Sequence, residues 1–99
     1  MQIETLVKRE VAKIAPNAQV ILFGSRARGD FRTDSDWDFL VLLDHALTRD
    51  MKNLILDKIY DLELENNTVI SLLIHSKSEW ETLEITPIYQ IIKKEGRPA

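Results

Sequence analysis

The chain has 99 residues, 44% of them hydrophobic and 29% charged, which is the size and balance of one globular domain, expected to span residues 1–99. It contains no cysteine, which excludes disulfide bonds and thiolate metal sites. The formal net charge of −3 and the pI of about 5.3 argue against a protein that coats nucleic acid, so nucleic acid is not expected as a general partner.

The N-terminal segment lacks both the basic flank and the long apolar run of a signal peptide. No stretch of the sequence is apolar over the length that a membrane span requires. The absence of cysteine is compatible with a reducing compartment. We therefore expect a soluble cytoplasmic protein without a membrane partner.

Helical and strand patterns alternate along the chain, and glycine, proline and asparagine separate them. Strands that alternate with helices predict an α/β fold, with a small mixed β-sheet of at least three strands flanked by helices. The expected elements, in order, are a helix near 3–14, a strand at 19–23, a single helical turn between Gly24 and Gly29, a strand near 37–43, a helix from Thr48 to Asn66, a strand at 68–75, a short helix with a Ser78–Glu81 capping box, and a last helix from Thr86 to Gly96.

Two of these helices carry apolar residues at intervals that place them on one face, which we expect to point into the core. The strand at 68–75 is almost continuously apolar, as is typical of a central strand that is covered on both faces. The helical stripes are Met51, Leu54, Ile55, Ile59 and Leu62 in the longer helix and Ile88, Ile91 and Ile92 in the last one.

Two aspartates, Asp36 and Asp38, stand where the second strand begins. Side chains two residues apart on a strand point to the same face, with Cα atoms roughly 6.5–7 Å apart, so both carboxylates can reach one Mg²⁺. Asp38 is followed by an apolar run, and a carboxylate inside such a strand costs free energy unless it has a partner. Without further signals, an Asp-x-Asp pair is more often a pair of solvated acids.

Gly24 and Ser25 directly follow the first strand. Glycine lets a phosphate approach the backbone closely, and the N–H groups and hydroxyl that follow can donate to it. Arg26, Arg28 and Arg32 lie in the same loop and can neutralise a triphosphate. A lone Gly-Ser pair is usually an ordinary strand-ending turn, and a single loop arginine is as often solvated.

In combination, the sequence GSRARG at 24–29, SDWD at 35–38 and the apolar strand that follows resemble the polymerase-β-type nucleotidyltransferase superfamily. Ten residues separate Ser25 from Asp36, and this spacing of Gly-Ser and Asp-x-Asp is the specific part of the signal. The closest likeness is to minimal single-domain members, related to the antitoxins that are paired with HEPN-type ribonuclease toxins. A single minimal nucleotidyltransferase domain over 1–99 is the expectation.

The resemblance implies a role for each residue of the motif. Gly24 and Ser25 would hold the β- and γ-phosphates of a nucleoside triphosphate, with Arg28 as a further phosphate ligand. Asp36 and Asp38 would be the catalytic pair and would bind Mg²⁺, of which the family uses two ions. The reaction would transfer a nucleoside monophosphate, AMP from ATP, to a hydroxyl acceptor, which in the paired systems belongs to the toxin.

The sequence departs from the family at its third carboxylate, which usually lies on the neighbouring strand. Our placement of that position is Val69, and no Asp or Glu occurs between Asn66 and Ser78. One Mg²⁺ ion in place of two is then one expectation. The alternative hypothesis is a catalytically weakened binding module that neutralises a partner protein by contact.

A haloacid-dehalogenase-like phosphatase also uses an Asp-x-Asp pair and is a third hypothesis. In that class the apolar strand precedes the acids, whereas here FRTDS precedes them and FLVLL follows. A chain of 99 residues also leaves little room for a cap domain. Both observations disfavour this class.

Overall fold

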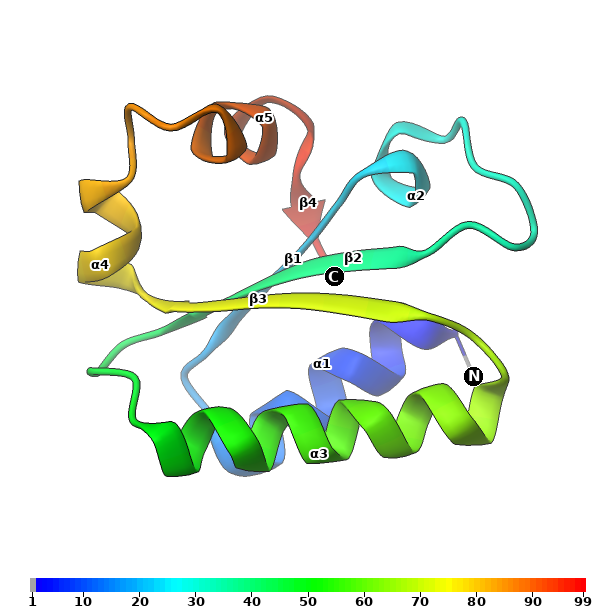
Figure 1. Cartoon of the computed structure of the whole chain (residues 1–99), viewed down its shortest axis with the longest axis horizontal. Helices are drawn as coiled ribbons and strands as arrows, with labels where there is room; N and C mark the ends of the chain where they lie inside the picture. The colour runs from blue at the N-terminus through cyan, green and yellow to red at the C-terminus, as the bar shows by residue number, and fades with distance from the viewer. Residues whose placement is uncertain (1) are drawn as a thin grey trace.

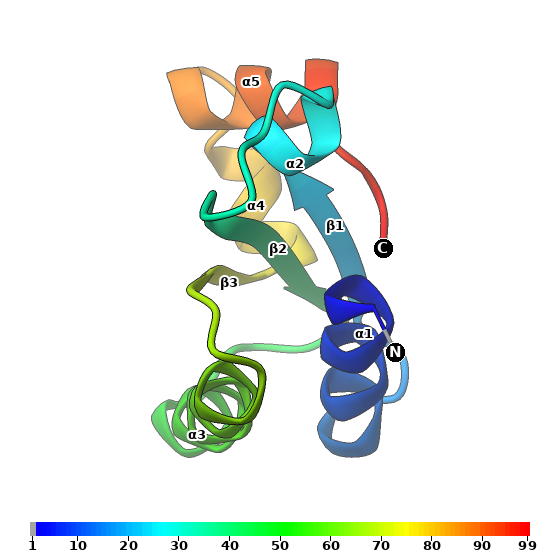
Figure 2. The same ribbon diagram turned by 90° about the vertical axis from the view of Figure 1, so that its right-hand side faces the viewer.

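The computed structural model describes residues 2–99, and its helices cover both faces of one four-stranded sheet (Figure 1). On one face α1 (Ile3–Ile14) and α3 (Arg49–Asn66) run side by side (Figure 2). On the other face lie α4 (Lys77–Thr82) and α5 (Pro87–Glu95), and α2 (Ser25–Arg28) is a single turn at one end of the sheet. None of the helices within residues 2–99 is long and apolar enough to cross a membrane.

The sheet is mixed and has the strand order β3-β2-β1-β4. β1 (Gln19–Phe23) pairs antiparallel with β2 (Trp37–Leu43) and with β4 (Arg97–Pro98), whereas β3 (Ile70–Ser76) runs parallel to β2. The parallel pair is joined through α3, because parallel neighbours need a crossover connection. The predicted mixed α/β fold of at least three strands is confirmed, and β4 adds a strand of two residues, too short to show a sequence pattern.

Alternation along β2 divides the core into two clusters, one on each face of the sheet. Towards α1 and α3, the larger cluster includes the fully buried Phe39. Towards α4 and α5, Leu40 packs in a smaller cluster with Trp80. Because side chains alternate along a strand, Asp38 points to the same face as Leu40, and Asp36 directly precedes the strand.

Most expected boundaries are confirmed: α1, β1 and β2 have the residues that their patterns predict, and one helical turn lies between Gly24 and Gly29. The Thr48 hydroxyl caps α3 by accepting from the Met51 N–H. The predicted Ser78–Glu81 capping box is wrong. β3 spans Ile70–Ser76, so it begins two residues later and ends one residue later than the predicted strand at 68–75. Ser76 Oγ caps α4 instead by accepting from the Glu79 N–H at 3.1 Å.

The predicted burial of three residues in the apolar stripes is also wrong, since Leu54, Ile88 and Ile91 are exposed. Successive helix residues are about 100° apart around the axis, so Leu54 and Ile91 turn away when Ile55 and Ile92 face the sheet. The predicted central position of the third strand is wrong as well. β3 is an edge strand, and its apolar character comes from α3 on one face and α4 on the other.

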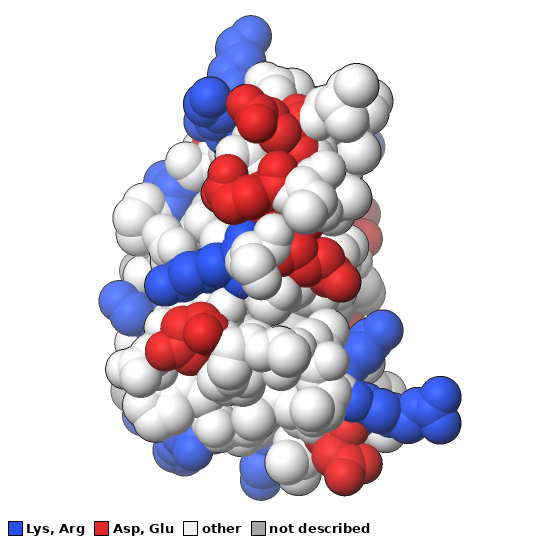
Figure 3. All heavy atoms as spheres, turned by 90° about the vertical axis from the view of Figure 1, so that its left-hand side faces the viewer, with Lys and Arg blue, Asp and Glu red and all other residues white. Residues whose placement is uncertain are grey.

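Charged side chains of both signs are spread over the surface. On the face that Figure 3 shows, acidic residues form several small groups between uncharged side chains, and Lys and Arg lie mostly at the margins. The described residues on that face therefore present no continuous basic surface of the kind that binds nucleic-acid phosphates. This distribution agrees with the net charge of −3.

Candidate functional site

The turn after β1 brings the backbone against the carboxylate of Asp38. Gly24 has φ 76° and ψ −161°, a conformation that essentially only glycine adopts. A Cβ built on Gly24 would collide with Asp38 Oδ2, so the absence of a side chain is needed for space as well as for the backbone angle. The next residue, Ser25, begins α2, in which the N–H groups of Ala27 and Arg28 both donate to the Gly24 carbonyl at 3.0 Å. The N–H groups of Ser25 and Arg26, at the first two helical positions, have no acceptor inside the helix.

Asp38 lies within β2, between Phe23 of β1 and Ser71 of β3. Burial and the neighbouring charge of Asp36 raise the pKa of Asp38 above its ordinary value; Arg28 opposes this rise and Glu95 adds to it. The charge of Asp36 therefore opposes ionisation of Asp38. A divalent cation would remove this repulsion, and two carboxylates with phosphate oxygens are a ligand set that suits Mg²⁺.

The neighbouring strand supplies no third acid. In the parallel register Asp38 lies beside Ser71, which shares its face of the sheet. Val69 is exposed and precedes β3, and its carbonyl accepts from the Trp37 N–H at 2.9 Å. Among residues 2–99, no group of three or more His, Cys, Asp or Glu side chains is arranged to hold a metal ion.

The three loop arginines have different surroundings. The guanidinium of Arg26 lies 4.4 Å from the ring centres of both Phe31 and Trp37, and it donates to the carbonyl of Ser35. Arg26 therefore connects α2 to the loop before β2, a structural role that its sequence position does not reveal. Arg28 lies closer to the acids, since its charge lowers the pKa of Asp38. Arg32 is exposed.

A residue that sequence reasoning missed lies at the centre of this arrangement. Glu95, the last residue of α5, accepts from the Gly24 N–H at 3.0 Å through Oε1. Arg28 Nη1 donates to the same carboxylate, at 3.1 Å to Oε1 and 3.2 Å to Oε2. The Glu95 side chain is 17% exposed. Seventy-one positions separate it from Gly24, so no local pattern could have indicated the contact.

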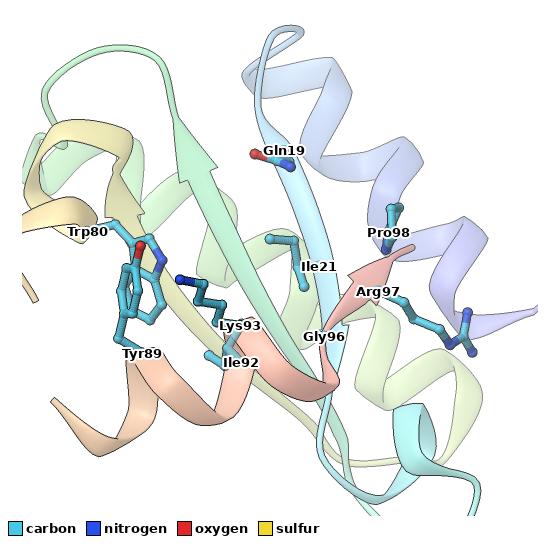
Figure 4. Close-up of a pocket in the computed structure, with 9 residues that line it drawn as sticks. All are labelled: Gln19, Ile21, Trp80, Tyr89, Ile92, Lys93, Gly96, Arg97 and Pro98. Atoms are coloured by element: carbon cyan, nitrogen blue, oxygen red, sulfur yellow. The ribbon is translucent and has the colours of Figure 1, made fainter. Parts of the chain in front are cut away.

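A groove of about 280 Å³ lies on the same side of the sheet, between β1, α4 and α5 (Figure 4). The rings of Trp80 and Tyr89 form one wall, with centres 5.1 Å apart, and Lys93 lies beside them. Arg97 points away from the groove and donates to Glu4 of α1. None of the predicted site residues lines this groove.

The fold, and the approach of the Gly24 turn to Asp38, are those expected of a nucleotidyltransferase domain. Residues 4–98 match the nucleotidyltransferase domain family, and the chain belongs to it. The chain is 33% identical over 73 residues to Protein adenylyltransferase MntA of Aphanizomenon flos-aquae. These 73 residues are 74% of this chain and 41% of that protein. The chain therefore spans about two fifths of the length of this curated relative.

Solved structures with the same fold come from toxin–antitoxin complexes. The chain is similar to one in a crystal structure of a toxin–antitoxin with AMP-PNP, with a TM-score of 0.71 and 19% identity over 98% of this chain and 72% of that chain. Two crystal structures of mutants of the toxin–antitoxin MntA–HpeT also match. The first, a double mutant, has a TM-score of 0.68 and 17% identity over 98% of this chain and 71% of that chain. The second, a single mutant, has a TM-score of 0.69 and 19% identity over 100% of this chain and 72% of that chain. At these identities the likeness shows the fold.

Proposed function

We propose that this chain binds a magnesium complex of a nucleoside triphosphate and transfers a nucleoside monophosphate, AMP from ATP, to a hydroxyl acceptor. The observation that carries the proposal is the approach of Gly24 to Asp38, where only a hydrogen atom fits beside the carboxylate. In the proposal, this approach joins the backbone and hydroxyl donors that would bind phosphate to the acids that would bind the metal. Family membership supports the same activity.

The side chains then divide the work between metal and phosphate. Asp36 and Asp38 would hold Mg²⁺, while the Ser25 hydroxyl, the Gly24 turn and Arg28 would hold the β- and γ-phosphates. When bound, the metal would neutralise phosphate charge and lower the pKa of the acceptor hydroxyl. The acceptor hydroxyl would lose its proton to water and its oxygen would bond to the α-phosphorus, while the bond from the α-phosphorus to the oxygen that bridges it to the β-phosphorus breaks and pyrophosphate leaves. With two carboxylates available, one Mg²⁺ ion is the simplest stoichiometry.

The proposed acceptor is a hydroxyl on a partner protein, a HEPN-type toxin. The relative at 33% identity is named a protein adenylyltransferase, and the structures with the same fold are toxin–antitoxin complexes. We place this reaction in the cytoplasm, where ATP and Mg²⁺ are available.

A second candidate function is a binding module that neutralises its partner by contact. The observation in its favour is that positions 69 and 71, beside the aspartate pair, are occupied by Val69 and Ser71 and not by an acid. Such a module would keep its partner interface without transferring a nucleotide. Asp38→Asn separates the two functions: it should abolish transfer and leave partner binding intact if the chain is an enzyme.

The first test is titration with ATP and Mg²⁺ while backbone amide NMR shifts are recorded. We expect magnesium-dependent shifts that cluster at 24–29 and 36–38 and that vanish in the Asp36→Asn/Asp38→Asn double variant. Transfer of labelled AMP to the partner then tests the reaction itself. If no amide shifts at millimolar Mg²⁺-ATP, the isolated chain has no nucleotide site and the contact-only module replaces the enzyme.

A further inference from the structure

The carboxylate of Glu95 occupies donors that the proposed function assigns to phosphate. Its Oε1 accepts from both the Gly24 N–H and Arg28, and Oε2 accepts a second bond from Arg28. A backbone N–H beside a guanidinium is a donor pair that suits a phosphate oxygen as well as a carboxylate oxygen. One anion already fills the position, and it belongs to the chain itself.

The surroundings of Glu95 make this more than a surface ion pair. Its side chain is 17% exposed, and its charge contributes to the raised pKa of Asp38. A triphosphate that reached Gly24 and Arg28 would approach Glu95 closely, and two anions at the same donors repel. The phosphate and the carboxylate therefore exclude each other. α2 and the end of α5 lie at the same end of the sheet (Figures 1 and 2).

We propose that Glu95 is an internal competitor for the phosphate position, which holds the Gly24 turn and Arg28 in place until a polyphosphate displaces it. The proposal rests on the proposed function and names the residue that sets the affinity of that site. It predicts that neutralising Glu95 strengthens binding of any ligand that carries a triphosphate. The expected gain is about tenfold, the factor that corresponds to about 1.4 kcal/mol, close to one charge-assisted hydrogen bond.

The test compares Glu95→Gln with the wild-type chain by calorimetric titration with Mg²⁺-ATP and with magnesium tripolyphosphate. The glutamine amide carries no negative charge but keeps an oxygen that can accept from Gly24. Glu65→Gln is the matched control, because Glu65 is exposed on α3, on the other face of the sheet, and the change in net charge is the same. Tripolyphosphate isolates the phosphate contribution from any contact of the base.

Tighter binding of both ligands to Glu95→Gln, with Glu65→Gln equal to wild type, would support the competitor. Equal or weaker binding to Glu95→Gln would overturn it and leave the nucleotide site standing. Failure of the wild-type chain and of both variants to bind either ligand would overturn the competitor together with the proposed function.

The wild-type protein supplies a second readout, which does not depend on how well any variant folds. The ¹³C shift of the Glu95 carboxyl group and the amide shift of Gly24 should both move as tripolyphosphate saturates the site. A Glu95 carboxyl shift that stays constant while the ligand binds would show that the carboxylate is not displaced, and would overturn the proposal.

Discussion

Replacing Gly24 with alanine tests most directly whether the site depends on the close approach of β1 to Asp38. Gly24 has φ 76° and ψ −161°, and holding a residue with a side chain there costs about 1–3 kcal/mol of unfolding free energy. The new methyl group would also collide with Asp38 Oδ2. Because Oδ2 is the free end of a side chain, the carboxylate would turn away at little further cost. We therefore expect Gly24→Ala to be moderately destabilised and to lose most of its affinity for Mg²⁺-ATP.

Gly29→Ala is the matched control, because Gly29 also has a positive φ, of 88° with ψ 4°. A Cβ there would meet nothing within 4 Å, so the substitution strains the backbone without touching the site. A left-handed conformation costs an alanine about 1–2 kcal/mol, similar to the cost at Gly24. Urea unfolding followed by tryptophan fluorescence measures the stability of both variants, and calorimetric titration measures their affinity for Mg²⁺-ATP.

The two variants should thus resemble each other in stability and differ in binding. Wild-type affinity in Gly24→Ala would refute the argument that Gly24 makes room for the metal-binding position of Asp38. An unfolding free energy equal to that of the wild type would refute the strain assigned to the backbone. Loss of binding in Gly29→Ala as well would show that the whole turn, and not the space at Gly24, determines affinity.

The remaining predictions concern acids and arginines around the site. The pKa of Asp38 is raised by burial and by Asp36, so the folded state binds a proton more tightly than the unfolded state and loses stability as pH rises through the folded pKa. Without divalent cations, Asp38→Asn should therefore raise the melting temperature more at pH 7 than at pH 4, and equal increases at the two pH values would contradict this. Added Mg²⁺ should raise the melting temperature of the wild type and not that of the variant. Arg26→Ala should cost about 1–2 kcal/mol of stability by removing contacts with two aromatic rings, and Arg26→Lys should not restore it, whereas Arg32→Ala should be neutral in the same urea titration. Ser71→Asp should strengthen Mg²⁺ binding in calorimetry, because it places a third carboxylate beside Asp38; a stronger gain from Val69→Asp would show that the metal lies nearer the start of the strand.

Local patterns determined what the sequence could predict. α1, β1 and β2 have the predicted limits because each is bounded by a proline, a glycine or a change from polar to apolar residues. The place of Asp38 inside β2 was also predictable, since alternation along a strand is a property of neighbouring residues. The choice between Ser76 and Ser78 as a cap was not, because both are followed three residues later by glutamate. The position at which β3 ends, Ser76, decides which of the two serines caps α4.

Contacts between distant segments carried the features that the sequence did not reveal. Arg26 could not be assigned to its two aromatic rings before the path of the loop at 30–36 was known. β4 has two residues and exists because the end of the chain returns beside β1. The same return places α5 so that Glu95 reaches Gly24. A glutamate at the end of an amphipathic helix otherwise has the pattern of a solvated residue.

The charges of the site connect its two proposed ligands. Glu95 and Asp30 both pair with the guanidinium of Arg28, whose charge also acts on Asp38 beside Asp36, and the negative excess is what a divalent cation would balance. Phosphate binding would release Glu95 from Gly24 and bring further negative charge to the cation. The cation thus removes a repulsion that opposes the phosphate, the phosphate adds an attraction for the cation, and linkage requires the coupling to be reciprocal. The absence of an acid on β3 makes this coupling more important, because the metal would have fewer protein ligands and would depend more on the phosphates.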